Sequence, residues 1–181
     1  VQAMPVGGGN VSVSGAVVTI NPSANLDSSQ GYYIQIAATA FDDASGNSFA
    51  GINNATTINF TAADATNPAL SSSVPADNAT GVAVGANIVL TFNENVAAGS
   101  GNITLKKSSD NTTVQAMPVG GGNVSISGAT VTINPTADLD SSQAYYLQIA
   151  ATAIDDTSGN SYAGINDATT LNFIAVDNVS P

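Results

Sequence analysis

The chain has 181 residues and a formal net charge of −11, because 13 acidic residues face only two lysines. It contains no His and no Cys, which excludes Ser-His-Asp and Cys-His nucleophile systems, thiolate or imidazole zinc sites and disulfides. Without a basic patch nothing neutralises phosphates, so we expect no nucleic-acid binding. We also expect no catalysis, and no membrane insertion, because no apolar run approaches the roughly 18 residues of a span.

An internal repeat organises the chain. Residues 1–68 match residues 114–181 with 52 identities in 68 positions, whereas residues 69–113 occur only once. We therefore expect a complete repeat with its linker at 67–181, and at 1–66 the C-terminal part of a repeat whose first strands are missing. Residues 1–66 are either a slice of a longer array or a partial domain that strands from another chain complete.

Apolar and polar residues alternate with period two through short segments separated by turn formers, which is typical of β-strands. No window keeps a helical stripe. Along the complete repeat the alternating positions are Ile88, Leu90 and Phe92, Ile103 and Leu105, Val124 and Ile126, Val131 and Ile133, Tyr145, Leu147 and Ile149, and Leu171 and Phe173. About seven strands per complete repeat predict an all-β fold of tandem immunoglobulin-like antiparallel β-sandwiches.

The order of several motifs resembles the bacterial Ig-like domain of the SbsA type. These motifs occupy residues 74–82, 88–96, 101–105, 131–135, 139, 145–146 and 156–160. The resemblance covers 69–177, and residues 1–66 match its later part. It implies a sandwich repeat of S-layer proteins and giant surface adhesins, where it serves as spacer and scaffold. The expected function is a structural repeat segment of a long exported bacterial surface or extracellular protein, without enzymatic activity.

Two copies of an acidic loop, 41–47 and 154–160, are the candidate metal sites. Adjacent carboxylates followed by Ser, Gly and Asn offer the hard oxygen ligands that Ca²⁺ prefers. The linker and the loop after the Phe92 strand are expected at the same end of the sandwich. The candidate ligands are Asp42, Asp43 and Asn47, their copies Asp155, Asp156 and Asn160, and Asp64, Asn67 and Glu94. Similar array proteins hold calcium between domains, so the resemblance implies calcium-stiffened junctions. The alternative is a plain turn in which Asp caps its own backbone.

Two other functions stay open at this point. The chain is alternatively a subunit of a self-assembling extracellular filament or sheath, completed by strand exchange between copies of itself. It is alternatively a glycan-binding module, because strand alternation places the rings of Tyr33 and Tyr146 outside the core, where they can stack on a sugar. If the chain is a structural repeat segment, its expected partners are neighbouring repeats of the same protein, and its expected location is extracellular or at the bacterial cell surface.

Overall fold

The computed structural model describes residues 2–179, and the contacts within the chain divide it into two units, Val1–Ala65 and Thr66–Pro181. All regular secondary-structure elements among the described residues are β-strands. None of the described residues forms a helix long and apolar enough to cross a membrane. The all-β prediction is confirmed.

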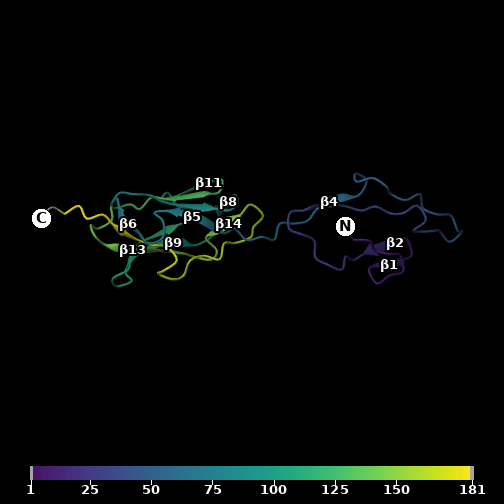
Figure 1. Cartoon of the computed structure of the whole chain (residues 1–181), viewed down its shortest axis with the longest axis horizontal. Coiled ribbons are helices and arrows are strands. Elements are labelled where there is room, and N and C mark those ends of the chain that lie inside the picture. The colour runs from purple at the N-terminus through teal and green to yellow at the C-terminus, as the bar shows by residue number, and fades with distance from the viewer. Residues whose placement is uncertain (1, 180–181) are drawn as a thin grey trace. The chain divides into compact units, whose positions relative to one another are not determined.

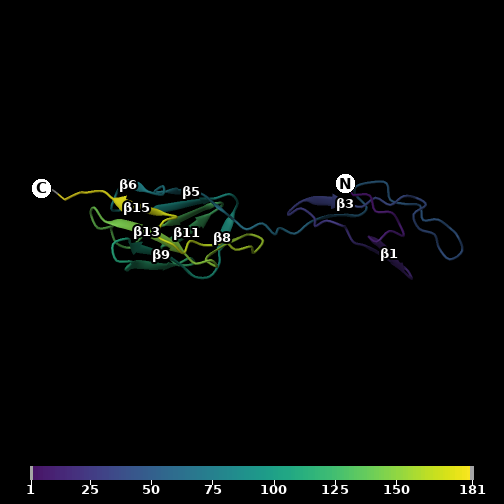
Figure 2. The ribbon, with the colours of Figure 1, turned by 60° about the horizontal axis from the view of Figure 1, so that its bottom comes forward.

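The second unit is a sandwich of two main sheets (Figures 1 and 2). One sheet has the order β10-β9-β13-β15-β6, with β6 (Ala79–Val82), β9 (Asn102–Lys107), β10 (Thr113–Pro118), β13 (Ala144–Ile149) and β15 (Asn172–Ala175). The other has the order β11-β12-β7-β5, with β5 (Leu70–Val74), β7 (Ile88–Phe92), β11 (Val124–Ser127) and β12 (Thr130–Ile133). A separate ladder joins β8 (Val96–Ala98) to β14 (Ile154–Asp156). All neighbours are antiparallel except β6 and β15, which run parallel.

The core lies between the two sheets and follows the predicted alternation. On β7, Ile88, Leu90 and Phe92 are buried and the residues between them are only partly covered. On β9 of the opposite sheet, Ile103 and Leu105 are completely buried. Apolar side chains from both sheets form one continuous cluster, and burial of such side chains is the main favourable term in folding.

Two details differ from the sequence-based picture. The first strand is divided, because the chain passes Pro75 and leaves β5 in one sheet to enter the other as β6; proline has no N–H with which to continue the ladder. The prediction that Tyr146 is exposed is wrong. Its ring is buried, its hydroxyl donates to Asn111 Oδ1 over 3.1 Å, and the Lys106 ammonium lies 5.8 Å from the ring centroid.

The first unit contains only part of this architecture. Its strands are β1 (Val11–Ser14), β2 (Val17–Ile20), β3 (Gly31–Tyr33) and β4 (Asn59–Thr61), and they form two separate pairs, β1–β2 and β3–β4. They correspond in the repeat to β11, β12, β13 and β15. Residues 69–113, which form β5 to β9 and the start of β10, have no counterpart here. Among residues 2–65 only Val11 is buried.

We predict that Gly164→Ala strongly destabilises the second unit. Gly164 has φ +80°, and a Cβ there would lie 2.5 Å from the Ile149 carbonyl oxygen, in the bridge that joins Ile149 to Ile165. The left-handed conformation and the clash with backbone together cost on the order of 3 kcal/mol. Denaturant unfolding of this variant measures the loss. Gly122→Ala is the matched control, because a Cβ on Gly122 meets open space, and an equal loss in both variants contradicts the prediction.

Candidate metal centre

The loop after β14 is held by the side chain of Asp156. Asp156 Oδ1 accepts hydrogen bonds from the backbone N–H groups of Ser158 and Asn160, each over 2.8 Å. Asp156 Oδ2 accepts a third hydrogen bond, from Asn160 Nδ2 over 2.7 Å. Gly159 has φ +92°, a conformation that glycine adopts without strain and that lets the chain reverse inside this short loop. The carboxylate is thus the centre of a turn, as in the alternative interpretation of this motif.

Asp156 is buried, and its charge is stabilised locally. Burial raises the pKa of its carboxyl, while the hydrogen bonds from Asn160 and from the backbone of Asn160 and Ser158 lower it. The hydrogen bonds prevail, so the pKa of Asp156 lies below its usual value. Among the described residues no buried side-chain polar atom lacks a hydrogen-bond partner. The buried polar side-chain atoms of the loop therefore have hydrogen-bond partners without a metal ion, and a bound ion would add further contacts.

Asp155 has a different role from its neighbour. Its Oδ1 accepts a hydrogen bond from Ser161 Oγ over 2.6 Å, across the bridge that pairs Asp155 with Ser161. Its carboxylate also lies close to Gly99, where a Cβ would come within 2.6 Å of Asp155 Oδ2. Successive residues of a strand point to opposite faces, which separates the two adjacent carboxylates predicted to act together.

Within the second unit a different pair of acids comes together. Carboxylate oxygens of Glu94 and Asp156 lie within 4.8 Å of each other and could take part in holding a metal ion. Glu94 follows β7 in the turn to β8. Next to it, Asn93 accepts a hydrogen bond from the Ala69 N–H over 2.7 Å and donates its own backbone N–H to Ala69 O. Those two bonds fix the start of β5 against the turn that carries Glu94.

The chemistry of this pair suits a hard divalent cation. The two carboxylates provide anionic oxygens, the ligands that Ca²⁺ takes in sets of six to eight with carbonyl groups and water. Like charges this close raise one another's free energy unless a cation or a proton neutralises them. Asn67 and Asn160 are the remaining predicted ligands of the second unit; Asn67 is exposed, and the Asn160 side chain already donates to Asp156.

The matching loop of the first unit repeats the turn without the acidic pair. Asp43 Oδ1 accepts from the N–H groups of Ser45 and Asn47, and Asp43 Oδ2 accepts from Asn47 Nδ2. Asp42 accepts from Ser48 Oγ. All of these residues are exposed. Glu94 has no counterpart in residues 2–65, because it belongs to the segment 69–113 that occurs once.

Asp167 is a strongly perturbed acid that sequence reasoning missed. Its carboxylate accepts hydrogen bonds from the backbone N–H and the hydroxyl of both Thr169 and Thr170. The Thr170 hydroxyl, followed by the other three donors, lowers the pKa of Asp167 to about 2. The counterpart Asn54 accepts the same four bonds through one amide oxygen. The two Thr residues after each position were the available signal for a capped turn.

We predict that Asp156→Ala lowers the melting temperature of the second unit by roughly 4–8 °C, because the Ser158 and Asn160 donors lose a buried carboxylate acceptor. Asp43→Ala is the matched control, since it removes the same three bonds from an exposed loop. We expect it to shift the melting temperature by less than about 1 °C. Thermal unfolding followed by circular dichroism measures both, and equal effects would show that burial of the loop is irrelevant.

Asp167→Asn tests the acid dependence. A carboxyl whose pKa falls from 3.8 to about 2 on folding contributes stability above pH 3.8, and this contribution is lost as the pH falls through about 2. An Asn keeps the acceptor oxygen, as Asn54 shows, but does not titrate. We expect the parent chain to lose more stability than the variant between pH 5 and 2, measured as melting temperature. Parallel pH profiles contradict the assignment.

Comparison with protein families matches the bacterial Ig-like domain to residues 1–62 and 64–174. Comparison with curated proteins finds no match. Among solved structures, the crystal structure of the S-layer protein rSbsC(31-844) is similar with 17% identity and a TM-score of 0.41, over 64% of this chain and 14% of that chain. The crystal structure of the N-terminal part of the bacterial S-layer protein SbsC is similar with 18% identity and a TM-score of 0.41, over 62% of this chain and 24% of that chain.

The chain thus spans only 14% and 24% of the lengths of those two proteins. The family match is the stronger evidence, because its two ranges cover nearly all of the chain. The second range coincides with the strands of the complete sandwich, and the first with the residues that repeat its later strands. The chain belongs to the bacterial Ig-like domain family.

Proposed function

We propose that the chain is a structural repeat segment of a long exported bacterial surface or extracellular protein, in which Ig-like sandwiches follow one another in tandem. The observation that carries the proposal is the near-identity of residues 1–68 and 114–181, since repeat architectures arise from copies of one unit. The repeats would extend over 1–66 and 67–181. Neighbouring repeats of the same protein would be the principal partners.

The chemistry of the surface supports a non-catalytic, solvent-exposed role. The net charge of −11 comes with only 8% charged residues, so Ser, Thr, Asn and Gly cover much of the surface. The perturbed acids Asp43, Asp156 and Asp167 all accept hydrogen bonds within their own turns. Each therefore has a structural task that accounts for its pKa. A net negative charge keeps such a chain soluble and apart from its copies.

We propose further that Ca²⁺ binds the acidic pair formed by Glu94 and Asp156. The ion would supply positive charge that offsets their mutual repulsion and would tie the β7–β8 turn to the loop after β14. Asp155, Asn160, Asp64 and Asn67 are the secondary ligand candidates that the sequence suggests. The corresponding residues Asp42, Asp43 and Asn47 lack a Glu94 counterpart in residues 2–65, so we assign the ion to the second set.

The filament and glycan-binding alternatives now differ in the observations that support them. Exposed apolar residues of the first unit favour the filament alternative, in which strands from another chain complete this unit, or completion of the unit by some other segment. The glycan-binding alternative loses one of its two rings, because Tyr146 is buried while Tyr33 remains 52% exposed. A single exposed ring is ordinary for a protein surface.

Calcium dependence of thermal unfolding tests the metal proposal. With Ca²⁺ at about 100 times its dissociation constant, the second unit gains about 2.7 kcal/mol relative to excess chelator, which raises its melting temperature by several degrees. Glu94→Gln removes one ligand charge, and we expect it to abolish most of this rise. Asp110→Asn, in the β9–β10 turn outside the acidic pair, is the control and retains the rise. A calcium effect that persists in Glu94→Gln, or none in the parent chain, refutes the site.

A further inference from the structure

The first unit exposes residues whose copies form the core of the second. Val18 is 38% exposed whereas its copy Val131 is fully buried, and Phe60 is 43% exposed whereas Phe173 is 1% exposed. The same holds for Leu26, at 39%, and its copy Leu139, at 6%. Each pair is identical in residue type and lies in a closely similar local sequence. The difference therefore comes from what covers these side chains.

In the second unit the cover is residues 69–113. Strand β7 pairs with β12, with Leu90 opposite Val131 and Ile88 opposite Ile133. Strand β9 pairs with β13 in the other sheet, with Leu105 opposite Leu147 and Ile103 opposite Ile149. One segment thus supplies strands to both sheets, β5 and β7 to one and β6 and β9 to the other, with apolar side chains in the core between them.

Two strand edges of the first unit are free at the corresponding places. Among the described residues, strand β2 pairs with β1 alone, whereas its copy β12 pairs with both β11 and β7. In the same part of the chain, strand β3 pairs with β4 alone, whereas its copy β13 pairs with both β15 and β9. Such edges present unpaired N–H and C=O groups that can accept a further strand.

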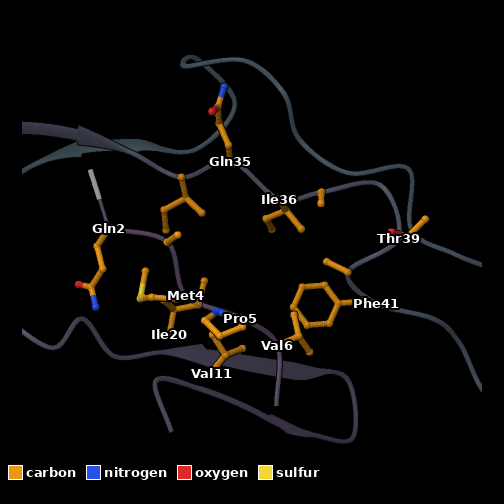
Figure 3. A pocket seen from close by; sticks show the side chains of 14 residues that line it. Gln2, Met4, Pro5, Val6, Val11, Ile20, Gln35, Ile36, Thr39 and Phe41 are labelled. Atoms are coloured by element: carbon orange, nitrogen blue, oxygen red, sulfur yellow. The ribbon is translucent and has the colours of Figure 1, made fainter. Parts of the chain in front are cut away.

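An apolar groove lies next to these edges. In Figure 3 the side chains of Met4, Val11, Ile20, Ile36 and Phe41 converge on a common space. The groove has a volume of about 490 Å³. An adjoining groove of about 980 Å³ is lined by residues that include Val18, Ile34, Ile52 and Ile58. Copies of these lining residues contact the 69–113 segment or belong to the core cluster that it completes.

We propose that residues 2–65 form an acceptor site for an extended polypeptide segment with the strand pattern of residues 69–113, supplied from outside the second unit. One strand of this partner, alternating as Ile88, Leu90 and Phe92 do, would pair with β2. A second strand, alternating as Ile103 and Leu105 do, would pair with β3. The main-chain bonds give affinity and the apolar side chains give register, as in other strand additions.

The second unit is the template for this assignment, because it shows an almost identical acceptor with its donor segment in place. A second copy of the chain is a poorer donor. Each chain contains one 69–113 segment and two regions that can receive it, so transfer between copies would uncover as much apolar surface as it covers. A lipid or small apolar ligand would leave the edge N–H and C=O groups unpaired. The inference depends neither on calcium nor on a surface location.

The test adds a synthetic peptide of residues 69–113 to the full chain. We expect one peptide to bind per chain, measured by anisotropy of a labelled peptide. We also expect amide hydrogen exchange in residues 11–20 and 31–36 to slow at least tenfold, whereas exchange in the second unit stays unchanged. Leu90→Asp with Leu105→Asp in the peptide places charges against the groove and is expected to abolish both effects.

Matched variants of the chain locate the binding surface. Val18→Asp places a carboxylate where the copy Val131 is fully buried, and we expect loss of peptide binding. Val17→Asp changes the adjacent residue, which is 63% exposed and points to the other face, so binding should persist. Because neither substitution lies in the second unit, we expect both variants to keep the fold of that unit.

Three results would overturn the proposal. The first is equal binding of the peptide to Val18→Asp and Val17→Asp, which would mean that the peptide adheres nonspecifically. The second is a dimer whose amide exchange in residues 11–36 is already slow before peptide is added, which would make a second copy of the chain the occupant of the site. The third result concerns a chain in which a second copy of residues 69–113 is fused before Val1. In that chain, amide hydrogen exchange in residues 11–61 must be as slow as in residues 124–174, and faster exchange would overturn the proposal. Calcium melting of the unmodified chain is read separately, so failure here leaves the proposed calcium site untouched.

Discussion

The packing of β7 and β9 against their neighbours is the interaction on which the rest of the fold depends. Both strands come from residues 69–113, yet they contribute to opposite sheets, so one segment supplies apolar side chains to each side of the core. A sheet that is apolar on one face must bury that face against another layer. With this segment present, the strands after it close a sandwich; without it, closely similar strands among residues 2–65 form two short antiparallel pairs.

The acidic loops show how the packing of β7 and β9 affects the candidate site. Asp43 and Asp156 make the same three hydrogen bonds, so the turn is a local property of Asp-x-Ser-Gly-Asn. Of these two, Asp156 alone is buried, and the Glu94 carboxylate lies within 4.8 Å of it. Its burial follows from β14 pairing with β8, and the residue that accompanies it, Glu94, lies on the turn before β8. A local turn thus becomes a candidate ion site only inside a complete sandwich.

Much of the fold and part of the site were predictable from individual residues. Alternation on β7 and β9 identifies Ile88, Leu90, Ile103 and Leu105 as core, because a period of two places them on one face. The same rule fails for Tyr146, since the turn after β9 folds back to cover the outer face of β13. Adjacency in sequence also suggested that Asp155 and Asp156 act together, whereas the strand directs them to different partners.

The sequence by itself determined the all-β class, the repeat and the turn chemistry, because these depend on residue spacing and on hydrogen bonds between residues two to four apart. Tertiary structure decided which carboxylates meet, which tyrosine is buried and which copy of a strand is covered. Glu94 and Asp156 are far apart along the chain, and the pairing of β8 with β14 brings them together. Identical residues such as Val18 and Val131 differ in burial because burial depends on the strands that surround a residue.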